Sequence, residues 1–193
     1  MMNRLRRGNG QAIVEFALVL PLMLILVLGI VEVGYALLDQ QVVTKLTREG
    51  SNLISRDVTL QDAAAAMKSM KTRPVDFDGG SKLIFSVVKK VATAGTPNFD
   101  KVILYQRYQY GSLAAASALT TRGPAAFGGP PNYEAASSDT DTNLQLAPLP
   151  PGLVIVRGGM AYVTEIFTTH TLITPLDRFG VTLPDTLYSI AYF

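Results

Sequence analysis

The first segment's chemistry depends on one carboxylate, Glu15, which lies five residues after Gly10. No charged residue occurs in residues 16–31, whereas residues 4–7 contain three arginines. An ionised carboxylate is unfavourable in hydrocarbon, so an isolated one inside an apolar run indicates a function and a partner. We therefore expect Glu15 to pair with a cation.

Other candidates for chemistry are few. The single histidine, His170, lies at the end of a predicted strand, and because a catalytic base needs an oriented partner, we expect a lone histidine there to be structural rather than catalytic. Residues 139–143 begin like a calcium loop, but Leu144 replaces the turn glycine and Pro150 replaces the bidentate glutamate. No phosphate loop, dinucleotide fingerprint or nucleophile elbow is present. We predict no enzymatic activity, no catalytic residue, no cofactor and no metal.

The composition argues against nucleic-acid binding and against functions that need cysteine. The 193 residues include 17 Lys and Arg against 15 Asp and Glu. Without the three arginines of residues 1–10, 14 basic residues face 15 acidic ones, and no basic patch indicates nucleic-acid binding. The absence of cysteine excludes disulfides and thiolate metal sites.

Residues 12–38 predict a membrane-spanning helix whose only charges are Glu15 and Glu32. Such a helix is about 40 Å long, enough for the ~30 Å hydrocarbon core of a bilayer. Basic residues flank only its N-terminal side, so we expect a cytoplasmic N-terminus. Glu32 then lies at the outer headgroup level, where water can solvate it. Pro21, inside the span, favours a kink.

Three interpretations fit this segment. A cleaved secretory signal peptide has an apolar core of roughly 7–15 residues, shorter than this run. A plain signal anchor explains the length and orientation but leaves Glu15 and residues 8–10 without a role. The third is a class III signal, typical of pilins, in which cleavage after Gly10 makes Gln11 the first mature residue and Glu15 the fifth.

A family resemblance supports the third interpretation. Residues 10–22, continued by residues 29–34 and 45–51, resemble TadE-like minor pilins, or pseudopilins, of the tight-adherence (Tad/Flp) type IV pilus system. The resemblance covers about residues 8–56. It implies processing at Gly10 and Gln11 by a prepilin peptidase. It also implies pairing of Glu15 with the new amino terminus of a neighbouring subunit.

The same resemblance implies the partners and the location. We expect the inner membrane, other minor and major pilins and the pilus assembly platform as partners, with no nucleic acid. The chain would cross the bacterial inner membrane once, with a periplasmic C-terminal domain that reaches the pilus tip or cell surface after assembly. The membrane helix would use Phe16, Leu18, Pro21, Leu24 and Gly29.

The expected function is that of a structural minor pilin or pseudopilin in Tad pilus assembly, priming or tip formation. An alternative stays open: a single-pass, membrane-anchored periplasmic binding module that is not incorporated into a filament. The first interpretation makes the apolar helix an assembly element, and the second makes it an anchor only.

Elements after the membrane are expected to form a small α+β domain. The helix continues as a stem to Arg56, with Val43, Leu46, Leu53 and Ile54 near helical spacing. Thr59 has the position of an N-cap for a helix that ends before Pro74. The expected divisions are a leader (1–10), a transmembrane and stem helix (11–56) and an α+β domain (57–193) with a flexible insertion at about 111–151.

Strand signals occur at residues 83–91, 101–108, 153–156, 160–169 and 187–193, with hairpin-loop residues at 93–98. In the second of these strands, alternation predicts that Val102, Leu104, Gln106 and Tyr108 share one face. Together these strands predict a mainly antiparallel sheet that packs on the stem helix.

Overall fold

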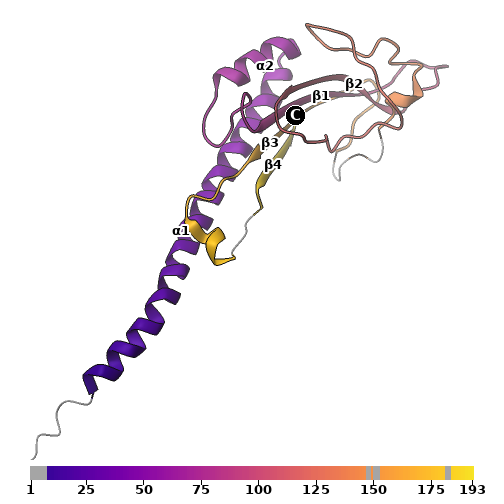
Figure 1. The fold of residues 1–193 in the computed structure, drawn as a ribbon. Coiled ribbons are helices and arrows are strands. Elements are labelled where there is room, and N and C mark those ends of the chain that lie inside the picture. The colour runs from indigo at the N-terminus through magenta and orange to yellow at the C-terminus, as the bar shows by residue number, and fades with distance from the viewer. Residues whose placement is uncertain (1–7, 147–148, 150–152, 181–183) are drawn as a thin grey trace, which may run out of the picture. The chain divides into compact units, whose positions relative to one another are not determined.

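A computed structural model describes residues 8–146, 149, 153–180 and 184–193. The elements are α1 (Gly8–Ile54), α2 (Leu60–Ser69), β1 (Ser81–Lys90), β2 (Val102–Gly111), η1 (Thr142–Leu144), β3 (Met160–Thr169), η2 (Pro175–Phe179) and β4 (Thr186–Tyr192) (Figure 1). The predicted α+β fold, a long apolar helix followed by an antiparallel sheet, is confirmed.

The chain divides into two compact units. Unit 1 comprises Met1–Leu38 and Thr171–Asp185, and unit 2 comprises Asp39–His170 and Thr186–Phe193. Helix α1 therefore contributes its first part to unit 1 and its last part to unit 2. The arginine-rich part of the expected leader, residues 1–7, lies outside the described residues.

Unit 2 contains a four-stranded antiparallel sheet in the order β2-β1-β3-β4. The predicted hairpin of β1 and β2 and the predicted strand at residues 187–193 are both confirmed, and the latter, β4, lies at an edge of the sheet. The prediction of a strand at residues 153–156 is wrong, because these residues form no strand. Ile155 is buried and Leu153 packs partly against the same cluster, while Val154 is 88% exposed, so side-chain packing holds this apolar run without a ladder partner.

A β-bulge changes which face of the sheet the side chains of β2 lie on. The register shifts between Val87 and Val88, and Tyr105 has no partner across β1. Leu104 consequently packs with Val88, whereas Tyr108 packs in the separate cluster that contains Phe85. The prediction that Leu104 and Tyr108 share a face is therefore wrong, because one extra residue reverses the alternation.

One face of the sheet packs against α2 and the last part of α1. The prediction of an N-cap at Thr59 is confirmed, since its hydroxyl accepts a hydrogen bond from the Asp62 amide at 3.1 Å. Apolar residues of both helices and of the sheet line this core: Val43, Leu46 and Ile54 from α1, Leu60, Ala63, Ala64 and Met67 from α2, and Leu83, Phe85, Val87 and Ile166 from the sheet. The stem stripe predicted from the sequence thus packs on the protein's own domain.

Gly50 marks a close approach of α1 to this sheet. A Cβ at this position would lie 2.8 Å from Thr164 Cγ2 and 3.1 Å from Phe85 Cε1. Glycine normally weakens a helix, but here the missing side chain lets α1 lie against β1 and β3.

The opposite face of the sheet is covered by residues 112–146. Leu119, Leu144 and Ala135 of this segment are buried, and Asn98 Nδ2 donates to the carbonyls of Ser138 and Asp141, both at 2.8 Å. Such contacts explain how a segment with almost no regular structure can still cover a sheet. Flexibility of the expected insertion at 111–151 stays a prediction.

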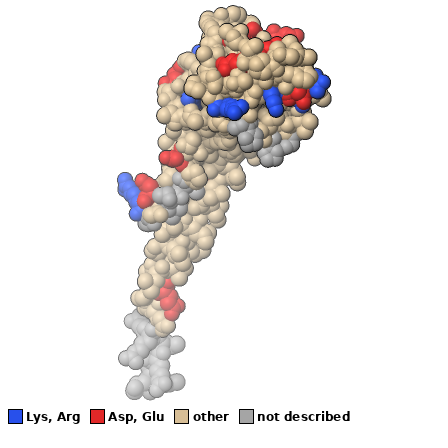
Figure 2. All heavy atoms as spheres, turned by 90° about the vertical axis from the view of Figure 1, so that its right-hand side faces the viewer, with Lys and Arg blue, Asp and Glu red and all other residues tan. Residues whose placement is uncertain are grey.

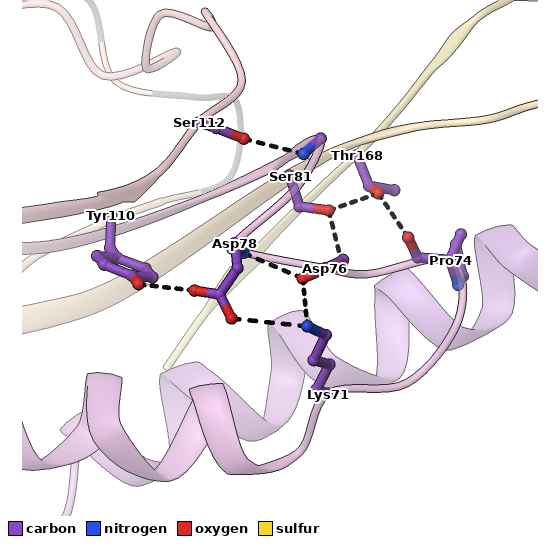
Figure 3. Close-up of polar contacts among 9 residues, drawn as sticks. Lys71, Pro74, Asp76, Asp78, Ser81, Tyr110, Ser112 and Thr168 are labelled. Carbon is purple, nitrogen blue, oxygen red and sulfur yellow. Dashed lines mark hydrogen bonds and ion pairs between the residues drawn. The ribbon is translucent and has the colours of Figure 1, made fainter.

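A polar network fixes the connection between α2 and β1 (Figure 3). Lys71 Nζ lies 2.8 Å from Asp76 Oδ1, and the Tyr110 hydroxyl donates to Asp78 Oδ1 at 2.9 Å. Deeper in the network, Ser81 and Thr168 share a 2.7 Å hydrogen bond between their hydroxyls. These bonds fasten the connection to β1, β2 and β3 together.

The ion pair in this network predicts a pH response. The hydrogen bond from Lys71 is the largest cause that lowers the pKa of Asp76. Because this folded-state pKa is depressed, the stabilisation is present above the ordinary aspartate pKa and is lost as pH falls through the folded value. In the variant Lys71→Met, carboxyl-carbon NMR titration should show the pKa of Asp76 rising toward its ordinary range. An unchanged titration would contradict this, and Lys101→Met serves as the control.

Candidate functional site: carboxylates of the apolar helix

The first part of α1 exposes apolar side chains on all sides. Every residue from Gly10 to Leu24 is exposed, including Phe16 at 63% and Leu18 at 73%. On the face drawn in Figure 2, few charged residues lie along this helix, whereas Lys, Arg, Asp and Glu gather over the sheet. This helix is also the one described helix that is long and apolar enough to cross a membrane. A helix that is apolar all round needs lipid or other helices around it.

Glu15 lies on this exposed surface, within the first turns of the helix. Gln11 Nε2 donates to Glu15 Oε1 at 2.9 Å, one helical turn away. The structure thus brings together two of the predicted processing and pairing residues. A neutral amide satisfies part of the carboxylate's hydrogen-bonding capacity but supplies no positive charge, so the predicted cation partner stays a prediction.

The other predicted site residues follow Glu15 along α1. Pro21 lies inside the helix, which continues through it to Ile54. Leu24 is exposed, and Gly29 is partly covered. Their roles in membrane contact and assembly stay predictions.

Glu32 is fully buried, which differs from the expected solvation. Its carboxylate accepts hydrogen bonds from the Ile173 amide at 3.0 Å and from the Thr174 amide and hydroxyl at 2.8 and 2.6 Å. These donors belong to the segment Thr171–Gly180, here called the strap, which returns to α1 after β3. The expectation was wrong because backbone donors in the strap replace water around the carboxylate.

The strap covers one face of α1 within unit 1 (Figure 1). The partly or fully buried residues of this stretch, Ile25, Leu28, Gly29, Glu32 and Ala36, recur at helical spacing, whereas the residues between them are exposed. In the strap, Leu176 is 1% exposed. The short helix η2 is followed by a C-cap at Gly180, whose φ of 76° suits glycine. The apolar helix is therefore exposed on all faces from Gly10 to Leu24, whereas from Ile25 to Ala36 the strap covers one face and the other faces stay exposed.

The Glu32 contacts predict local opening of the strap when the carboxylate is removed. Hydrogen bonds to charged groups contribute about 1.5–3 kcal/mol each, so Glu32→Ala should speed amide exchange at Ile173 and Thr174 by about tenfold or more. Hydrogen–deuterium exchange of the full chain in detergent micelles measures this. Glu32→Gln, which keeps one acceptor oxygen, should have a smaller effect. Glu15→Ala is the matched control, and equal exchange in all variants would contradict the role of Glu32.

A second carboxylate, Asp39, lies seven residues after Glu32 and belongs to unit 2. His170 Nδ1 and Asp39 Oδ2 share a 3.0 Å hydrogen bond, and both residues are buried. The histidine thus ties the end of β3 to α1. This contact agrees with the structural role expected for His170.

A buried acid–base network holds the segment after β2 on the sheet. Glu165 of β3 is 0% exposed and accepts hydrogen bonds from the Ala118 amide at 2.8 Å, the Tyr188 hydroxyl at 3.0 Å and the Ser117 hydroxyl. Ser117 in turn accepts from Arg107 Nη2 at 3.0 Å. The serine hydroxyl therefore links the cation to the carboxylate.

Burial affects the ionisation of the network's members. Burial lowers the pKa of Arg107, and the charge of Glu165 opposes this shift. Burial raises the pKa of Tyr188, with a further contribution from Glu165, so the phenol stays protonated and donates. Each member has a structural partner, and the arrangement orders a loop.

Sequence reasoning missed Glu32, Asp39 and the Glu165 network as interacting groups. Glu32 and Asp39 carried a usable signal, because a carboxylate on an apolar helix face requires donors. Their partners could not be found from spacing, since Ile173 lies 141 residues beyond Glu32. Among the described residues, no group of three or more His, Cys, Asp or Glu side chains could hold a metal ion.

Comparison with known proteins connects the apolar helix to a family. Residues 10–52 match the family model described as TadE-like protein. No curated protein and no solved structure matches the chain. The matched residues run along α1 almost to its end at Ile54, and they include Gly10, Glu15 and Glu32. The resemblance drawn from the sequence is confirmed for residues 10–52, and over this segment the chain is similar to TadE-like proteins.

Proposed function

We propose that the protein is a structural, non-enzymatic minor pilin or pseudopilin. A prepilin peptidase cleaves it after Gly10, and α1 then enters a Tad filament or priming complex. The observation that carries the proposal is the position of the TadE-like match, which falls on a helix that is apolar and exposed on all sides from Gly10 to Leu24. Helix–helix contacts in a filament can replace lipid around such a surface.

Charge supports the proposed direction of insertion and the site of cleavage. Three arginines precede Gly10 and no basic residue follows until Lys45, so the leader stays in the cytoplasm and the sheet domain crosses to the periplasm. Cleavage on the cytoplasmic side keeps α1 from Gln11 onward and creates an α-amino group at Gln11. The amino group is a cation in the low-dielectric region where Glu15 needs one.

Mass spectrometry of membrane-extracted protein tests the processing step. Cells with an active prepilin peptidase should yield a chain that begins at Gln11, and cells without the peptidase should yield the leader-bearing chain. A leader-bearing chain in both strains, with the protein correctly in the membrane, would reject the proposed cleavage.

We predict that replacing Glu15 impairs assembly of the protein but not its insertion into the membrane. The variant Glu15→Ala removes the partner of a neighbouring amino terminus, and it should lower incorporation into sheared pili or priming complexes at least tenfold. Quantitative immunoblotting of the filament and membrane fractions measures both steps. Leu18→Ala, also exposed on α1, is the matched control. Normal incorporation of the Glu15→Ala protein would reject the pairing role.

Immunoblotting of the filament and membrane fractions also distinguishes a filament subunit from the alternative, an anchored binding module. Residues 11–24 can be replaced by an unrelated apolar helix, which leaves Glu32 and the strap unchanged. An anchored module keeps its function after this exchange, whereas a filament subunit loses incorporation.

A further inference from the structure

The two edges of the sheet in unit 2 differ in how their backbone groups are satisfied. Along the outer edge of β2, the amides of Ala135 and Leu146 donate to the carbonyls of Tyr105 and Val102 at 2.9 and 3.0 Å. The Arg107 amide donates to a carbonyl of the same covering segment at 3.2 Å. Residues 133–146 therefore close this edge from Val102 to Arg107.

The outer edge of β4 is open at its C-terminal end. Tyr162 and Phe193 exchange both backbone hydrogen bonds, at 3.0 and 2.9 Å. In an antiparallel ladder the intervening residues direct their amides and carbonyls away from the neighbouring strand, which applies here to Tyr188, Ile190 and Tyr192. Gln40 Nε2 donates to the Tyr188 carbonyl at 3.2 Å. Within the described part of the chain, no group bonds to the outward amides and carbonyls of Ile190 and Tyr192.

The sequence of β4 carries none of the usual protection of an exposed edge. Residues 186–193 contain no charged residue and no proline, and they include an aromatic pair, Tyr192 and Phe193. Edge strands that must not pair with other chains normally carry lysine, proline or a bulge. An open, uncharged edge is suited to accept a further strand.

A groove adjoins this edge and contains polar side chains of α1. The groove has a volume of about 790 Å³ and is lined by Ile190, Ala191, Tyr192 and Phe193 on one side and by α1 on the other. Lys45 and Arg48 line the wall of α1, and no carboxylate of the described residues lies within 4 Å of either. Glu49 is the single acidic residue of the lining. The groove thus combines free backbone groups with a net positive wall.

We propose that this groove binds an extended, acidic segment of a second protein, which adds to the sheet as a fifth strand beside β4. The backbone groups of Ile190 and Tyr192 hold the segment in register, and alternate carboxylates face Lys45 and Arg48. Pairing between the β4 strands of two copies would bring both pairs of cations into one groove, so the charge favours an acidic partner over a second copy. The proposal requires neither leader cleavage nor filament formation.

The test uses the full chain in detergent micelles and two synthetic peptides. One has the sequence Thr-Val-Glu-Val-Glu-Val-Glu-Val-Thr, and the other carries lysine in place of every glutamate. Fluorescence anisotropy should show that the acidic peptide binds at least tenfold more tightly. In the double variant Lys45→Glu, Arg48→Glu this preference should reverse, and in Arg122→Glu, which lies outside the groove, it should persist.

Amide exchange gives a readout that does not require a variant. Adding the acidic peptide should slow exchange at the Ile190 and Tyr192 amides of the unmodified chain and leave the Ala191 amide, which faces β3, unchanged. Equal binding of both peptides, or no slowing at Ile190 and Tyr192 with saturating acidic peptide, overturns the proposal. A disulfide dimer formed by Ile190→Cys that the acidic peptide does not prevent would assign the edge to a second copy instead.

Discussion

Replacement of Glu165 by alanine is expected to lower the free energy of unfolding of unit 2 by about 3 kcal/mol or more. The substitution removes the acceptor of three hydrogen bonds and leaves the Arg107 guanidinium partly buried without its counter-charge. Removing one member of a buried charge pair is more destabilising than removing both. Urea unfolding of the full chain in micelles, followed by near-ultraviolet circular dichroism of the tyrosines, measures the change.

Two further variants separate the charge from the hydrogen bonds. Glu165→Gln keeps an acceptor for the Ala118 amide, so it should lower the free energy of unfolding less than Glu165→Ala does. The double variant Glu165→Ala, Arg107→Met should be less unstable than the sum of its single variants, because no isolated charge remains. A loss below about 1 kcal/mol for Glu165→Ala would mean that the network behaves like an exposed pair.

At Gly50, leucine is expected to destabilise unit 2 by about 3 kcal/mol, near the upper part of the usual range for overpacked cores. The first added carbon would already lie 2.8 Å from Thr164 Cγ2, and Thr164 is held in the middle of β3. Its β-branched side chain has few alternative rotamers, so the helix must move away from the sheet. Thermal unfolding of the sheet domain in micelles measures the loss.

The same helix offers a matched control for this prediction. A Cβ at Gly34 would meet no atom within 4 Å, so Gly34→Ala should be neutral or gain up to about 1 kcal/mol from helix propensity. Gly50→Ala should instead destabilise, although the chemical change is identical. Adding Thr164→Ser to Gly50→Ala removes the contacting methyl group and should recover part of the loss. The same sign at both glycines would contradict the close approach of α1 to the sheet.

Local patterns explain which parts of this fold could be predicted from the sequence. The hairpin of β1 and β2, the long strand β3 and the N-cap of α2 depend on residues close together in the chain, and each was predictable from them. Residues 153–156 show the limit of such patterns. They have strand-like composition, but a strand also needs a neighbouring ladder partner, and composition does not reveal one.

The interactions of the carboxylates could not be predicted for a different reason. Glu32, Asp39 and Glu165 meet donors from segments without recognisable patterns, and the donors of Glu32 are mainly backbone amides, which every residue except proline carries. A sequence indicates that a buried carboxylate needs donors, but not which of many equivalent amides will reach it. Gly10 and Glu15 were recognisable because their spacing along one helix carries the signal.

Occupancy of one face of α1 by the strap limits how many neighbours this helix can have. From Gly10 to Leu24 the full circumference is open, so several helices can surround it in a close-packed bundle. From Ile25 to Ala36 one arc is taken by the protein's own chain, and neighbours can approach only from the remaining side. The helix can therefore contact more neighbouring helices along residues 10–24 than along residues 25–36.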